Sequence, residues 1–271
     1  MDTGCPEFAN KKNDPMLTQF KKPFLPLLII LGKRVEKRRF TEPPIFIGGC
    51  ARTGTTVLLS ILSAHNDIHC FSKELGLFNK VLKDELGNSI PTRIDRLYTQ
   101  LLINKIPDSV NRWCEKSPSN IQRLGDIDNY FKGNFLFIQT IRDGRDVILS
   151  KHPKDEARYW VSPERWINDV SEGMKYINHP KVLTIKYEEL ILDFEATAAK
   201  ICSFLNISLS KEILNWHENT TVTENIALFT RIQLLHKSSI SKWKDPKYRE
   251  RVEELTGNPK GKELLKQCGY D

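Results

Sequence analysis

The chain has 271 residues, enough for one large domain or two small ones with a full hydrophobic core. Hydrophobic residues make up 39% and charged residues 28%, which is typical of a globular protein and excludes a fibrous or wholly disordered chain. The formal net charge of +7 favours an anionic partner, but residues 1–39 hold nine Lys and Arg against four acids. The rest of the chain is therefore almost neutral, which argues against a general nucleic-acid binder.

The six cysteines are scattered along the chain without a C-x-x-C pair: Cys5, Cys50, Cys70, Cys114, Cys202 and Cys268. Their spacing predicts neither a zinc site nor a disulfide framework, so we expect no metal. A reduced cytoplasmic setting is the corresponding expectation for the location of the protein.

Residues 1–42 are predicted to form a basic N-terminal extension, followed by a single domain over residues 43–271. The extension contains the apolar run Phe24–Leu31, which is shorter than the roughly 20 residues that cross a bilayer. This run starts late and is followed by basic rather than small residues, unlike a signal peptide. Two interpretations stay open: a segment packed against the domain, or an interfacial anchor on anionic lipid.

Three short apolar runs in chain order are predicted to be buried strands. Ile45–Ile47 leads into two glycines and then into a mostly apolar helix over Thr55–Ala64. Phe135–Ile141 is a near-continuous run of apolar residues, as expected for a parallel strand covered on both faces, and a helix is predicted over Asp143–Lys151. Val182–Tyr187 is the third strand.

Two further segments carry the apolar period of a helix. One runs from Trp166 to Ile177 and the other from Phe194 to Leu205. Strands that alternate with helices predict an α/β fold with a central, mainly parallel sheet flanked by helices. Ligands in such folds gather at the carboxyl ends of the strands.

Residues 49–56 read GCARTGTT between the first strand and its helix. Backbone N–H groups in such a turn, with a helix amino end behind them, bind a phosphate-like anion. Gly54 permits close approach of the backbone, and Thr53, Thr55 and Thr56 add hydroxyl donors. We therefore predict an anion site here.

A nucleoside-triphosphatase loop would carry a lysine where this chain has Thr55. The cation stands instead at Arg52, before the glycine. This pattern argues against transfer of a γ-phosphate and favours a donor that needs no metal.

Residues 50–56 (CARTGTT) resemble the 5′-phosphosulfate loop of sulfotransferases that use 3′-phosphoadenosine 5′-phosphosulfate (PAPS). The fold of that family is a P-loop-type α/β domain. Residues 135–150 (FLFIQTIRDGRDVILS) resemble the family's 3′-phosphate motif. The resemblance implies that Arg142 grips a phosphate bidentately and that Ser150 adds a hydroxyl. The alternative role for Arg142 is an ion pair with Asp143 or Asp146.

Weaker resemblances to the family continue toward the C-terminus. Residues 113–120 (WCEKSPSN) resemble the segment that places a lysine, here Lys116, near the transferring group. Residues 185–190 (IKYEEL) resemble the motif whose tyrosine, here Tyr187, lies by the nucleotide. Lys237 stands where cytosolic members contact the 3′-phosphate. The resemblance implies PAPS as donor and catalysis by Arg52, Lys116 and a general base.

The identity of the base rests on the loop after the first helix. Cytosolic members use a histidine where this chain has Pro118, whereas other members use a glutamate on this loop, here Glu74. The alternative role for Glu74 is a charge at the amino end of a helix starting there. His69 and His152 are reserve candidates.

Tyrosylprotein sulfotransferases have the most similar motifs. They carry a cysteine before an acidic pair in the base loop and another before the later lysine, which Cys70 and Cys114 match. Lys73 interrupts the acidic pair.

The acceptor is therefore left as a glycan, a lipid or sterol, or another small molecule, read by loops near 75–96 and 154–166. A small-molecule kinase and a non-catalytic nucleotide-binding module are the alternative functions.

Overall fold

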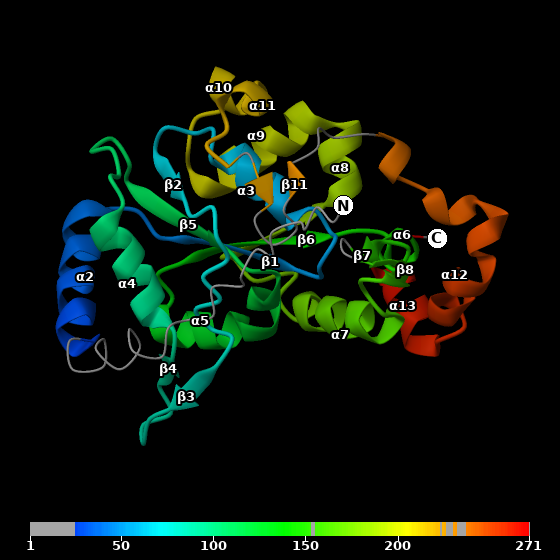
Figure 1. Cartoon of the computed structure of the whole chain (residues 1–271), viewed down its shortest axis with the longest axis horizontal. Coiled ribbons are helices and arrows are strands. Elements are labelled where there is room, and N and C mark those ends of the chain that lie inside the picture. Colours follow the sequence, from blue (N-terminus) through cyan, green and yellow to red (C-terminus); the bar gives the residue numbers. More distant parts are fainter. Residues whose placement is uncertain (1–24, 153–154, 223, 226–229, 232–236, 271) are drawn as a thin grey trace, which may run out of the picture.

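The computed structural model describes residues 25–152, 155–222, 224–225, 230–231 and 237–270. A five-stranded parallel sheet lies at its centre in the order β2-β5-β1-β6-β9 (Figure 1). Its strands are β1 (Ile45–Gly49), β2 (Ile68–Cys70), β5 (Arg112–Lys116), β6 (Leu136–Ile141) and β9 (Val182–Lys186). The predicted α/β class with a parallel sheet is confirmed.

Helices cover both faces of the sheet, which explains why β1 and β6 are almost wholly apolar. Figure 1 shows one face under α3 (Thr55–Leu62), α8 (Tyr187–Leu192), α9 (Phe194–Leu205), α10 (Lys211–Leu214) and α11 (Trp216–Asn219). The other face is covered by α4 (Ile94–Ile103), the 3₁₀ turn η1 (Pro118–Arg123), α5 (Leu124–Phe131) and α7 (Pro163–Met174). Each face has its own cluster of buried side chains, with Ile45 and Ile47 in one and Phe46 in the other. This alternation is the two-residue period of a strand.

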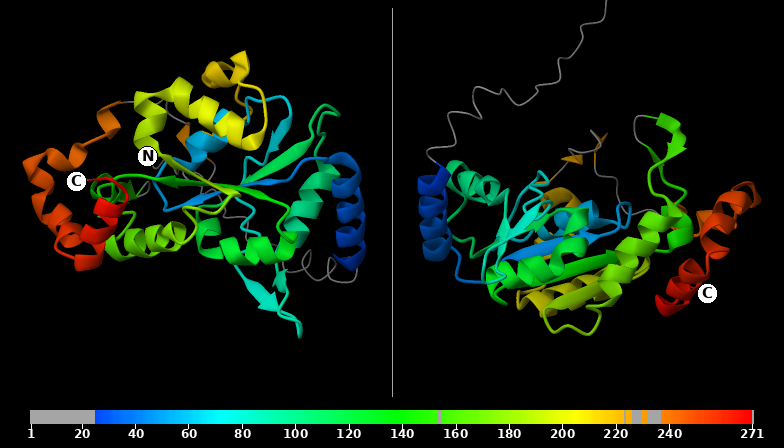
Figure 2. Two further views of the ribbon diagram at one scale, coloured as in Figure 1. Left: turned by 180° about the vertical axis from the view of Figure 1, so that it is seen from behind. Right: turned by 90° about the horizontal axis from the view of Figure 1, so that it is seen from below.

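The remaining elements lie at the two ends of the molecule, as both views in Figure 2 show. At one end, α2 (Leu25–Arg39) packs beside α4. The other end holds α6 (Gly144–Val147), the β7–β8 hairpin (Lys151–His152 and Asp155–Tyr159), η2 (Lys237–Ser239), η3 (Lys242–Lys244), η4 (Pro246–Tyr248), α12 (Arg249–Thr256) and α13 (Pro259–Gln267). Two more antiparallel pairs are β3–β4 (Val81–Lys83 and Ser89–Pro91), which projects from the body, and β10–β11 (Glu224–Asn225 and Thr230–Arg231).

Two helix predictions were wrong in extent. The helix expected over Asp143–Lys151 is only the four-residue α6, because the chain turns after Leu149 and enters the β7–β8 hairpin, where Ser150 accepts a backbone hydrogen bond from Trp160. Val147, Ile148 and Leu149 are all buried in this turn. The helix expected to reach Ile177 ends at Met174, and Ile177 is exposed.

None of the helices within the described ranges has the length and apolar character needed to cross a bilayer. Residues 1–24 of the predicted extension lie outside the described part of the chain, and so does His236, next to Lys237.

Candidate active site

The loop between β1 and α3 wraps around a buried threonine. The Thr53 hydroxyl donates to the carbonyl oxygen of Cys50 at 2.6 Å and lies 2.7 Å from the Thr140 hydroxyl on β6. Thr53 is fully buried, and its side chain supports the loop from inside. Thr55 is also buried, while Thr56 and Gly54 are partly exposed at the amino end of α3.

Gly54 is required at its position for two reasons. Its φ of 93° lies in the left-handed region that favours glycine, and a Cβ there would stand 2.6 Å from the Tyr187 ring. Tyr187 is the first residue of α8, directly after β9. The glycine loop and Tyr187, 133 positions apart in the chain, are therefore in direct contact.

Arg142 occupies the centre of the site at the end of β6. Its Nη1 donates to the carbonyl of Arg52 at 3.0 Å and its Nη2 to the carbonyl of Ser239 at 2.6 Å. The guanidinium also lies 4.4 Å from the centre of the Tyr187 ring. The Tyr187 hydroxyl is 3.2 Å from the Ser239 hydroxyl. The structure thus brings Arg52, Arg142 and Tyr187 together, as predicted.

The two arginines form a positively charged site. No ion pair among the described residues involves Arg52 or Arg142, and the buried Nε of Arg142 has no hydrogen-bond partner there. Partial burial first, and repulsion from Arg142 second, lower the pKa of Arg52 from its ordinary value. A cation pair with an unused buried donor is a place where an anion binds favourably.

The alternative ion-pair role predicted for Arg142 is taken by Arg145 instead. Arg145 pairs with Asp143 at 2.8 Å, and its guanidinium lies 3.7 Å from the centre of the Trp243 ring. Asp146 accepts backbone hydrogen bonds from Ser241 and Trp243 at 2.7 and 3.0 Å. These contacts hold the 239–243 segment over α6, which fits the prediction that Arg145 and Asp146 fix the loop.

Ser239 was missed by sequence reasoning, which stopped at its neighbour Lys237. Lys237 itself is exposed in η2, and Ser150 is partly exposed after α6. A signal was present in the run Ser238-Ser239, but no spacing rule connects it to Arg142. The contact exists because Asp146 anchors the following residues.

Glu74 and Lys116 form the second part of the site, at the end of β5. The Lys116 ammonium lies 2.5 Å from the Glu74 carboxylate. The Lys116 side chain is buried, whereas that of Glu74 is 37% exposed and so open to an acceptor. Lys116 pairs in register with Ile47 of β1, two residues before the glycine loop begins. The predicted base and the predicted catalytic lysine are therefore in contact.

The loop that carries Glu74 is held by Glu115, a residue sequence reasoning did not select. The Glu115 carboxylate is fully buried and accepts hydrogen bonds from the backbone N–H groups of Leu75 and Gly76 at 3.1 and 3.3 Å. It also accepts from Ser117 at 2.5 Å and Asn120 at 2.7 Å. Burial is the largest influence and raises the pKa of Glu115. Two adjacent residues of β5 therefore form this part of the site: Glu115 holds the loop that carries Glu74, and Lys116 is the partner of Glu74.

The structure also bears on the alternative role of Glu74 and on the two reserve candidates for the base. Residues 71–80 contain no helix, so a helix-end role for Glu74 is wrong. His69 lies beside Phe71 and next to the charge of Arg39, while His152 stacks on Trp160 at 4.6 Å. Of the three candidate bases, Glu74 is the one in contact with Lys116.

Cys70 and Cys114 are neighbours, as the resemblance implied. They face each other in register across β2 and β5, both thiols are buried, and both are free. Burial is the first cause that raises the pKa of the Cys114 thiol well above its ordinary value, with Cys70 next. The pair lies in the sheet below the loop that holds Glu74.

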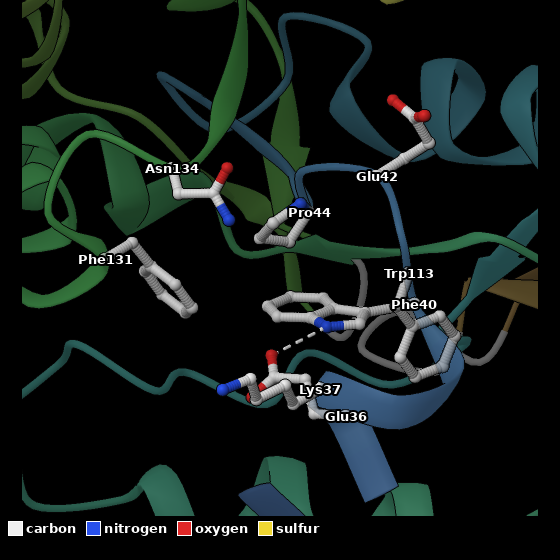
Figure 3. A pocket seen from close by; sticks show the side chains of 8 residues that line it. All are labelled: Glu36, Lys37, Phe40, Glu42, Pro44, Trp113, Phe131 and Asn134. Carbon is white, nitrogen blue, oxygen red and sulfur yellow. Dashed lines mark hydrogen bonds between the residues drawn. The ribbon is translucent and has the colours of Figure 1, made fainter. Parts of the chain in front are cut away.

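A pocket of about 240 Å³ lies elsewhere, beside the start of β1 (Figure 3). It is lined by Glu36, Lys37, Phe40, Glu42, Pro44, Trp113, Phe131 and Asn134. Figure 3 shows the indole N–H of Trp113 donating to the Glu36 carboxylate at 3.0 Å. This end of the strands is opposite to the glycine loop, so the pocket is not part of the candidate active site.

Comparisons with known proteins agree with this geometry. Residues 42–246 match the family described as "Sulfotransferase domain". A Caenorhabditis briggsae protein that carries the name of a protein-tyrosine sulfotransferase is 30% identical over 198 residues, which are 65% of this chain and 70% of that protein. The protein-tyrosine sulfotransferase of Drosophila melanogaster is 26% identical over 69% of this chain and 42% of its own length. Protein-tyrosine sulfotransferase 2 of Gallus gallus is 27% identical over 71% and 59%. The chain thus spans about half the length of the latter two.

Two solved structures share the fold. The sulfotransferase domain of the Synechococcus PCC 7002 olefin synthase superposes with a TM-score of 0.60 at 19% identity, over 86% of this chain and 96% of that domain. The sulfotransferase domain from the curacin biosynthetic pathway gives 0.59 at 18% identity, over 86% and 99%. At these identities the likeness concerns the arrangement of sheet and helices.

Proposed function

This chain belongs to the sulfotransferase family, and we propose on that premise that it transfers a sulfuryl group from PAPS to an acceptor hydroxyl. The observation that carries the proposal is the Arg142 guanidinium bound to the Arg52 carbonyl in the glycine loop, with the Glu74–Lys116 pair at the end of the neighbouring strand β5. The two arginines would bind the anionic donor, and the Glu74–Lys116 pair would act on the acceptor. Neighbouring parallel strands present both at their carboxyl ends.

Several residues fit the anionic ends of PAPS. The backbone at Gly54 and the amino end of α3 would hold the sulfated end, with Arg52 and Thr56 beside them. The unpartnered Nε of Arg142 would meet the 3′-phosphate, and Tyr187 would flank the nucleotide. Thr53 would contribute by holding the loop.

The chain's own part in the chemistry is to move one proton and to stabilise charge. Glu74 would take the proton of the acceptor hydroxyl as its oxygen forms a bond to sulfur and the bridging S–O bond breaks, releasing adenosine 3′,5′-bisphosphate. Lys116 and Arg52 would offset the negative charge on the transferring and departing oxygens. By analogy with phosphoryl transfer, positioning supplies most of the remaining rate.

The acceptor is proposed as a hydroxyl on a glycan, a lipid or sterol, or another small molecule. The names of the relatives add the phenolic hydroxyl of a protein tyrosine to this set. Two adjacent acids in this loop would suit a basic acceptor. Because this chain has Lys73 beside Glu74, we propose an acceptor with less positive charge.

The test has two steps on the full chain. Affinity for adenosine 3′,5′-bisphosphate should be the same with and without Mg²⁺, and labelled PAPS should be consumed with an acceptor library that includes tyrosine peptides. A requirement for Mg²⁺ and ATP would instead indicate a kinase. Tight nucleotide binding without transfer to any acceptor would indicate the non-catalytic module.

A further inference from the structure

The outward face of α2 has an apolar first half and a positively charged second half. Leu27, Ile30 and Leu31 in its first half are 54%, 50% and 42% exposed. The second half of the same face carries the exposed cations Arg34, Lys37 and Arg38. Positions 27, 31, 34 and 38 follow the i, i+4, i+7, i+11 spacing of one helical stripe, with 30 and 37 beside it.

The inward face of α2 is firmly attached to the body. Gly32 lies so close to α4 that a Cβ would stand 2.3 Å from that of Tyr98. Arg39 donates to the carbonyl of Ile106 and to Asp108. Glu36, the helix's one acid, turns inward to Trp113. The outward face is thus held in place and presents positive charge alone.

We propose that this face of α2 docks the protein on an anionic lipid surface. An interfacial helix lies in the plane of the bilayer with its apolar face buried by about 5–10 Å, and the exposed Leu27, Ile30 and Leu31 would be the side chains that enter. The cations that follow would then lie at the level of the headgroups. Both apolar contact and positive charge are needed, because neither alone gives stable binding.

Charge favours lipid over a second copy of the chain as the occupant. A symmetric pairing through this face would bring two clusters of Arg34, Lys37 and Arg38 into one interface, where like charges repel. An anionic bilayer has the complementary charge across its whole surface.

The experiment is co-sedimentation of the full chain with phosphatidylcholine vesicles, with and without phosphatidylserine, at low and raised salt. We expect binding that requires phosphatidylserine and weakens with salt. The double variant Arg34→Glu with Arg38→Glu should bind at least about 30-fold less, since each cation near an anionic surface is worth about fivefold. Leu27→Ser with Leu31→Ser should also bind at least about tenfold less, because the inserted apolar area is lost.

A matched control uses two exposed lysines of α13, at the other end of the molecule (Figure 2). Lys262→Glu with Lys266→Glu makes the same change in net charge and should retain binding. Equal binding to both kinds of vesicle, or an equal loss in the control, would overturn the proposal. So would an α2 double variant that changes the oligomeric state in light scattering while vesicle binding stays intact.

The inference does not depend on the proposed reaction. Transfer of label from PAPS to a soluble acceptor should be unchanged in both α2 variants, because the substituted side chains are exposed and are not among the contacts of Arg142 or Glu74. Loss of vesicle binding alone and loss of transfer alone are therefore separate results.

Discussion

The loop at 50–54 follows the central strand β1 and the loop at 71–80 follows the edge strand β2, and the protein holds the two loops differently. The first is supported from inside by the Thr53–Thr140 hydroxyl pair and covered by the Tyr187 ring. The second is held by polar groups that bind its backbone: Glu115 and Ser117 accept from its N–H groups, and Arg96 donates to its Leu75 carbonyl. Both loops thus contact the core, but the backbone beside the base depends on a buried carboxylate, whereas the anion loop depends on a hydroxyl pair and an aromatic ring. This difference predicts which substitutions act locally and which act at a distance.

The largest expected effect is on turnover. Glu74→Gln keeps the shape of the side chain but removes the proton acceptor, so kcat should fall by roughly 10²–10⁴ while donor affinity stays nearly constant. Single-turnover kinetics with labelled PAPS measures this. Glu195→Gln on the exposed side of α9 is the matched control. Full activity in Glu74→Gln would reject Glu74 as the base.

The next effect is on donor binding. Arg142→Ala removes a buried cation that makes charge-assisted contacts, so affinity for adenosine 3′,5′-bisphosphate should fall by about 2–3 kcal/mol. Isothermal titration measures it. Arg249→Ala, which breaks an exposed pair with Glu253, serves as control and should leave affinity unchanged. Unchanged affinity in Arg142→Ala would show that the anion binds elsewhere.

A smaller effect should distinguish positioning from catalysis. Glu115→Gln can keep one oxygen on the 75–76 backbone but then turns an NH₂ group toward the Asn120 amide, which is itself a donor, so the cluster that holds the base loop should loosen and kcat fall by about tenfold with KM for PAPS unchanged. If Glu115 acts through Glu74, the double variant with Glu74→Gln should be no slower than Glu74→Gln alone. Additive losses would show an independent role.

The smallest effect concerns support of the anion loop. Thr53→Val and Thr140→Val each remove one hydroxyl of the buried 2.7 Å pair, and each should lower the free energy of unfolding by about 1 kcal/mol. Nucleotide affinity should fall by a small factor in both, and somewhat more in Thr53→Val, because that hydroxyl also holds the Cys50 carbonyl. A loss of affinity in Thr53→Val that exceeds its loss of unfolding free energy would show that the side chain touches the donor directly.

Much of the donor site could be predicted from the sequence because its determinants are local. A strand, a glycine turn and a helix occupy 18 consecutive residues from Ile45 to Leu62, so β1, the loop and α3 follow from composition and period alone. The place of Arg142 in the site could be predicted because this residue directly follows an apolar run that forms a strand. Backbone geometry then explains why residue 54 is glycine, since both its φ and the Tyr187 ring exclude a Cβ.

Other features depended on packing between distant segments. The helix expected over Asp143–Lys151 was too long, because the chain leaves the helix after Val147 and Ser150 pairs with the distant Trp160 at the β7–β8 hairpin. Thr53 turned inward because Thr140 stands beside it on β6, a neighbour that only the strand order provides. Ser239 stood in no motif and Glu115 stood in the 113–120 motif without an assigned role, so the contacts of both came from the fold.

The sequence by itself determined the α/β class, the anion loop and the identity of its cations, because period, glycine and charge act over short stretches of chain. Only the tertiary structure decided that Lys116 meets Glu74, that Glu115 holds the base loop, and that one face of α2 is left exposed. Those outcomes depend on which strands are neighbours and which helix faces are covered, and such contacts join residues far apart in the chain.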